Sequence, residues 1–114
     1  MKTEVLDDIV SQYKGHGWTP RRAVLSESDF LLLKDYLINA HAGIEIHAGS
    51  ESGLWFSRRS LPDREAWELR RLSGSPFALM AVIEDSMPDT EREAVLHETQ
   101  MRMFSGNRPE ARSH

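Results

Sequence analysis

Two polar residues spaced two apart on a strand-like segment are the best candidates for contacts with a ligand. Residues 43–47 alternate apolar and polar side chains, which is typical of a half-buried strand, so Glu45 and His47 project from the same face. Arg59 follows a second strand-like segment at 54–58 and falls on that same face by alternation. A carboxylate, an imidazole and a guanidinium gathered there would serve as polar contacts to a small molecule or substrate.

The histidines and acidic residues do not form a recognisable metal motif. His41, Glu45 and His47 lie close together in the chain, but metal sites use a fixed ligand spacing on a defined element, and nothing like HExxH occurs. Glu93 and His97 are one helical turn apart, a spacing that ordinarily adds a little helix stability. The chain has no cysteine, which excludes thiolate ligands and disulfides. We expect neither a metal nor a cofactor.

No catalytic motif stands out. The serine and glycine residues at 49–53 lack the GxSxG elbow of serine hydrolases and the lysine of a phosphate-binding loop. Acidic residues at 84–93 border the predicted start of a helix, where capping and the helix dipole already favour them. The sequence therefore leans against an enzyme.

The charge of the chain disfavours nucleic acid as a partner. Arginine pairs occur at 21–22, 58–59 and 70–71, yet the net charge is −4 and the isoelectric point is about 5.7. That sign is wrong for a protein that gains affinity by neutralising phosphates, and no glycine-aromatic run typical of RNA-recognition sheets is present. We expect the arginines to be solvated or paired with carboxylates.

The apolar pattern predicts alternating helices and strands in the first half of the chain. An amphipathic helix spans 5–13, a weak strand follows at 21–25, and a helix begins at Ser26 or Ser28 and ends near residue 40. The two strand-like segments 43–47 and 54–58 are joined by a flexible loop and are predicted to form an antiparallel hairpin.

The second half of the chain repeats this order. Pro62 suits the first turn of a helix over 61–72, whose apolar residues recur at helical spacing. Residues 77–83 form an uninterrupted apolar run that is too short for a helix between its flanking breakers, which predicts a strand buried on both faces. A last helix follows from 89 to about 104.

The resulting order of elements predicts the fold class. Strand, helix, strand, strand, helix, strand between Trp18 and Glu84 is the order of the ferredoxin-like split βαβ fold, a four-stranded antiparallel sheet with both helices on one face. We predict an α+β protein of this type with an added N-terminal and an added C-terminal helix. Residues 1–104 form a single domain, and 105–114 form a flexible tail.

The second face of such a sheet stays open unless a helix, a second subunit or a ligand covers it. The first functional hypothesis is a small binding or regulatory module that self-associates through this face as a homodimer. Trp55, Met80 and Val82 would be its apolar contacts, and His47 and Arg59 would lie at the rim.

The alternative hypothesis is a small-molecule-binding protein or minor enzyme. Its pocket would lie between the second sheet face and the final helix, with Glu45, His47 and Arg59 as polar contacts.

Location is inferred from two further features of the chain. Its longest apolar run is far shorter than the ~20 residues that a membrane-spanning helix needs. The first residues also lack the apolar stretch of a secretory signal. We expect a soluble, cytoplasmic protein with no membrane partner.

Overall fold

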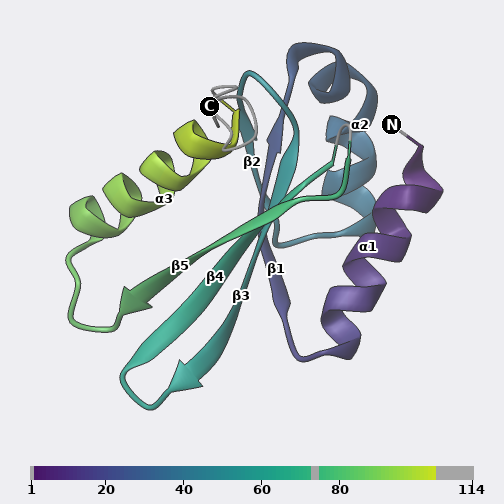
Figure 1. Cartoon of the computed structure of the whole chain (residues 1–114). Helices are drawn as coiled ribbons and strands as arrows, with labels where there is room; N and C mark the ends of the chain where they lie inside the picture. Colours follow the sequence, from purple (N-terminus) through teal and green to yellow (C-terminus); the bar gives the residue numbers. More distant parts are fainter. Residues whose placement is uncertain (1, 73–74, 105–114) are drawn as a thin grey trace.

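The computed structural model describes residues 2–72 and 75–104, which fold as an α+β protein (Figure 1). Its three helices are Thr3–Gly15 (α1), Glu27–Ala40 (α2) and Asp89–Phe104 (α3). Its five strands are Thr19–Leu25 (β1), Glu45–Ala48 (β2), Gly53–Leu61 (β3), Arg64–Arg71 (β4) and Ala78–Glu84 (β5). The strands form one open sheet in the order β2-β1-β3-β4-β5, with α1 and α2 on one face and α3 on the other.

The segment from β1 to β2 is a strand, a crossover helix and a parallel strand. The Ser26 hydroxyl caps α2 by accepting the N–H of Asp29 at 3.4 Å, one of the two caps expected from the sequence. Leu33 and Leu37 project from α2 and are buried in the core on this face of the sheet. β2 then pairs in parallel with β1, as a crossover connection requires.

The predicted hairpin of residues 43–47 with 54–58 is wrong. β1 lies between β2 and β3, so the loop that joins β2 to β3 must cross the end of β1. Gly49 makes this crossing possible: its N–H donates to the Leu25 carbonyl at 2.9 Å, and a Cβ there would lie 2.5 Å from Val24 Cγ1. Strand alternation correctly put Glu45 and His47 on one face of their strand, but it carries no information on which strands are neighbours.

The helix predicted over 61–72 is also wrong, because this segment forms β4. Pro62 and Asp63 are the two-residue turn between β3 and β4. Trp67 and Leu69, two residues apart, are both buried on the face that α3 covers. Pairing with β3 on one side and β5 on the other outweighs the helical preference of the local residues.

These two corrections remove the ferredoxin-like arrangement. The sheet is mixed rather than antiparallel, it has five strands rather than four, and its helices cover both faces. The α+β class, the strand at 21–25 and the two added terminal helices are confirmed. The predicted tail at 105–114 lies outside the described residues.

Polar contacts tie α1 to both the sheet and α2. Tyr13 stacks on Phe56, with 4.0 Å between ring centroids, and its hydroxyl donates to Glu68 of β4. Burial and the Glu68 carboxylate raise the pKa of that hydroxyl. Asp7 accepts the hydroxyl of Tyr36 at 2.5 Å and lies 2.8 Å from His41 Nε2. The hydrogen bonds from Tyr36 and His41 lower the pKa of Asp7 and favour its ionised form.

Adjacent leucines of α2 give a matched test of this packing. Leu33 is 1% exposed and Leu32 is 67% exposed. Leu33→Ala should lower the free energy of unfolding in urea by about 3 kcal/mol, since it removes buried methyl groups and leaves a cavity. Leu32→Ala should change it by less than about 0.5 kcal/mol. Equal losses for the two variants would show that α2 does not dock on the face described.

Candidate functional site

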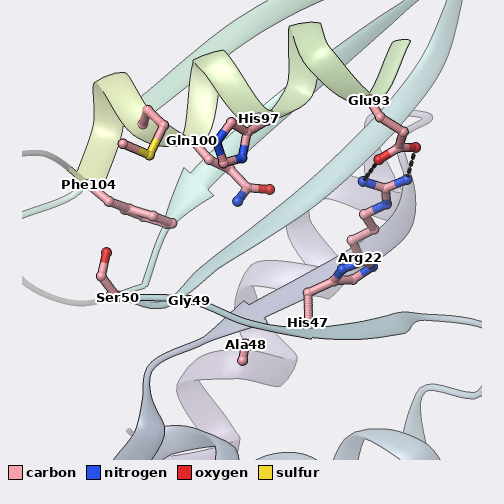
Figure 2. Close-up of a pocket in the computed structure, with 10 residues that line it drawn as sticks. Arg22, His47, Ala48, Gly49, Ser50, Glu93, His97, Gln100 and Phe104 are labelled. Atoms are coloured by element: carbon pink, nitrogen blue, oxygen red, sulfur yellow. Dashed lines mark hydrogen bonds and ion pairs between the residues drawn. The ribbon is translucent and has the colours of Figure 1, made fainter. Parts of the chain in front are cut away.

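A groove runs between α3 and the β1–β2 side of the sheet (Figure 2). Its volume is about 530 Å³, and we refer to it as the α3 groove. It exists because α3 packs over β4 and β5 and leaves β1 and β2 uncovered on this face. The residues that line the α3 groove are Arg22, His47, Ala48, Gly49, Ser50, Glu93, His97, Gln100, Met101 and Phe104.

α3, which forms one wall of the groove, is held on the sheet by its buried side chains. Leu96 and Met103 pack into an apolar cluster with Trp67 and its neighbours in the sheet. Trp55, which is fully buried there, donates its indole N–H to Gln100 Oε1 at 2.9 Å. Because this bond occupies the amide oxygen, the NH₂ group of Gln100 is the part that can donate into the α3 groove.

Arg22 occupies the polar end of the groove. Its guanidinium donates to both carboxylate oxygens of Glu93, at 2.9 and 2.5 Å, and its Nε lies 3.3 Å from Glu45 Oε1. The side chain of Arg22 is only 11% exposed, so the contact links β1 and β2 to α3 in a partly desolvated setting. A second guanidinium, that of Arg92, lies 3.7 Å from both Glu93 and Asp89, so this end gathers two cations and three carboxylates and is negative when its histidines are neutral.

The ion pairs perturb both carboxylates in the same direction. Hydrogen bonding to Arg22 lowers the pKa of Glu93. The hydrogen bond from His47, whose Nε2 lies 3.1 Å from Glu45 Oε1, lowers the pKa of Glu45, and the Arg22 charge adds to the effect. Both groups are therefore ionised at neutral pH and act as hydrogen-bond acceptors.

The other end of the groove is apolar. Met101 and Phe104 come from the last turn of α3 and line this part of the groove together with Ala48 and Gly49. Gly53 permits the approach of Phe104, because a Cβ on that residue would lie 3.3 Å from Phe104 Cζ. Ser50 adds a hydroxyl at the rim. The α3 groove is thus sorted into a charged end and an apolar end.

The structure brings together only part of the set that the sequence singled out. Glu45 and His47 lie on the same strand face and meet Arg22 at the α3 groove. Arg59 projects from the same sheet face but lies at the far end of β3, where it pairs with Asp85 at 2.9 Å. Arg22 takes the place that the sequence reading gave to Arg59.

The three predicted apolar contacts do not share a surface. Trp55 is buried beneath α3, with Arg22 and Leu69 as its cross-strand neighbours. Met80 and Val82 are exposed and lie on the opposite face, since directly paired residues share a face and Met80 pairs with Glu68. At Trp55, the sheet face that was predicted to be open is covered by α3 of the same chain.

His97 and Gln100 were missed as groove residues. Sequence reasoning paired His97 with Glu93 along the helix, whereas Glu93 binds Arg22. A signal was present: residues 93, 97, 100 and 104 recur at helical spacing beside the buried stripe of α3. That second stripe marks the flank of α3 that faces the groove.

Two negative findings apply to the described ranges. Residues 2–72 and 75–104 contain no group of three or more side chains placed to hold a metal ion, and His41 lies on the α1 side, away from His47. Of the helices seen there, none is long and apolar enough to cross a membrane.

Comparisons with known proteins do not identify this chain. No protein-family model matches it, and comparisons with curated proteins and with solved structures likewise found no match. Function therefore has to be argued from the α3 groove itself.

The Arg22–Glu93 contact gives a pH-dependent prediction. The pKa of Glu93 is lowered by folding, so the stability that the pair contributes is present above the unfolded pKa of about 4.3 and is lost as pH falls through the lower folded value. Glu93→Gln should cost about 1 kcal/mol of unfolding free energy at pH 7, and the difference from wild type should be smaller at about pH 3, where the Glu93 carboxylate of the wild type begins to take up its proton.

Glu98 provides the control for this measurement, because it is exposed on another flank of α3 and does not line the α3 groove. Glu98→Gln should leave stability nearly unchanged at both pH values when urea unfolding is followed by tryptophan fluorescence. A loss for Glu93→Gln that is the same at both pH values would rule out the ion pair as its source.

Proposed function

We propose that this protein is a small-molecule-binding module whose ligand occupies the α3 groove. The observation that carries the proposal is the sorting of the groove into a charged end at Arg22 and an apolar end at Met101 and Phe104. Ligand sites commonly combine an apolar lining with a few placed polar groups, in volumes of roughly 300–1,000 Å³. The α3 groove, at about 530 Å³, falls within that range.

The charged end favours a ligand that donates hydrogen bonds. The carboxylates of Glu45, Glu93 and Asp89 outnumber the guanidiniums of Arg22 and Arg92, so a further anion would be repelled. A primary amine placed there would add a cation next to two carboxylates. Its apolar ring or chain would then lie against Met101 and Phe104. We therefore propose a small amphipathic amine as the ligand class.

Binding is favoured over catalysis by the exposure of the polar pair nearest to the ligand. The His47 and Glu45 side chains are 45% and 64% exposed, so water competes for both. Electrostatic catalysis depends instead on groups that are shielded from water and held in place. A cytoplasmic location and a regulatory role stay predictions from the sequence.

A thermal-shift screen tests the proposal directly. Primary amines that carry an aromatic ring or short alkyl chain should raise the melting temperature, and carboxylates of the same shape should not. At ten times the dissociation constant, binding adds about 1.4 kcal/mol of stability, which corresponds to roughly 5 °C for a domain of this size.

Adjacent positions on α3 supply the matched variants. His97→Trp places a large side chain in the α3 groove and should abolish the shift, whereas Glu98→Trp places the same side chain outside it and should leave the shift intact. The proposal fails if no amine stabilises the wild type, or if His97→Trp and Glu98→Trp respond alike.

A further inference from the structure

β5 is an edge strand with little to protect it from pairing. It ends the sheet order, and its residues 78–83 contain neither a charge nor a proline, the devices by which edge strands usually avoid pairing. Met80 is 54% exposed and Val82 is 51% exposed on the face opposite α3. Among the described strands, β4 is the sole partner of β5.

Two hydrogen bonds determine which backbone groups of β5 point outward. Arg71 donates its N–H to the Phe77 carbonyl at 2.8 Å, and Asp85 donates to the Asp63 carbonyl at 2.8 Å. In an antiparallel pair, the residues that bond to the partner strand alternate with those that point away. The odd-numbered residues of β5 therefore bond to β4, and Ala78, Met80, Val82 and Glu84 direct their N–H and C=O groups to the free edge.

A second copy of β5 fits this edge in one particular register. If two β5 strands pair antiparallel about Ala81, Met80 lies opposite Val82 of the other copy and Ala78 lies opposite Glu84. Every outward-pointing residue then has an outward-pointing partner, and each such pair exchanges two N–H···O bonds. In the neighbouring register, Met80 of one copy would lie opposite Met80 of the other. Glu84 would then lie opposite Pro76, which has no N–H.

The side chains are complementary in the same register. Met80 and Val82 of the two copies would form one apolar cluster and leave water together. Arg70 lies directly across β4 and β5 from Ala78, so Glu84 of the other copy would lie beyond the small Ala78 side chain and within reach of Arg70. The two-fold axis creates this Arg70–Glu84 contact twice.

We propose that the protein forms a two-fold homodimer in which the β5 strands pair antiparallel about Ala81 and continue the sheet from one copy into the other. The partner is a second copy of this chain, because in this register the outward backbone groups, the apolar side chains and the charges of one copy complement those of the other. This surface differs from the one expected from sequence, since Trp55 has no part in it. The α3 groove lies toward the opposite side of the sheet, so the dimer does not depend on the proposed ligand.

Light scattering and sedimentation on purified chain test the dimer. The wild type should have twice the 13.0 kDa mass of one chain. Val82→Lys should raise the dimer dissociation constant by more than about 100-fold, because each copy would bring an unpaired ammonium group into the contact. Leu31→Lys, at an 81% exposed apolar position of α2, should leave the dimer intact.

Exchanging the charges of Arg70 and Glu84 tests the dimer even if Val82→Lys does not fold. Glu84→Arg should weaken the dimer, and adding Arg70→Glu should restore it, because the contact between copies is then reversed rather than lost. A wild type that stays monomeric at every concentration overturns the proposal. So does a dimer that survives both Val82→Lys and Glu84→Arg, or one that Leu31→Lys dissociates instead.

Discussion

The structure depends on a mismatch between the width of the sheet and the width of the helices that cover it. An α-helix with its side chains is about 10–12 Å across, whereas neighbouring strands lie about 4.8 Å apart, so one helix covers roughly two strands. α3 covers β4 and β5 on one face, and α1 and α2 cover the β1–β2 side of the other. The central strand β3 is covered on both faces, by Tyr13 of α1 on one and by Gln100 of α3 on the other, and each face leaves a different edge of the sheet open. The α3 groove and the exposed Met80–Val82 surface are the two consequences.

Arg22 connects this geometry to function. Without a polar link, α3 would rest only on the apolar cluster around Trp67 and Leu69 at one side of the sheet. The bidentate contact between Arg22 and Glu93 connects α3 to β1, and the contact between Arg22 and Glu45 connects β1 to β2. Among the described residues, Arg22 is thus the one side chain that joins β1, β2 and α3 at the charged end of the α3 groove.

The sequence predicted side-chain direction for β2 and β3, but it predicted neither the neighbours of each strand nor the face on which Met80 and Val82 lie. Glu45, His47 and Trp55 were correctly placed on one face because alternation is a local property of the backbone. Segment 61–72 was misread because alanine, glutamate, leucine and arginine all favour helices, and only pairing on both sides makes it β4. Arg22 was not identified as the central site residue because its partners come from α3 and β2, far away in the chain.

The central claim is that the open part of the α3 face is a ligand site. Titration of the ¹⁵N-labelled chain with the primary amines of the thermal-shift screen tests it most directly, because backbone and side-chain amide signals report position. The account predicts shift changes at residues 47–50 and at the Gln100 side-chain amide. Changes confined to β5 or to the exposed side of α2, with the α3 groove signals unmoved, would contradict it.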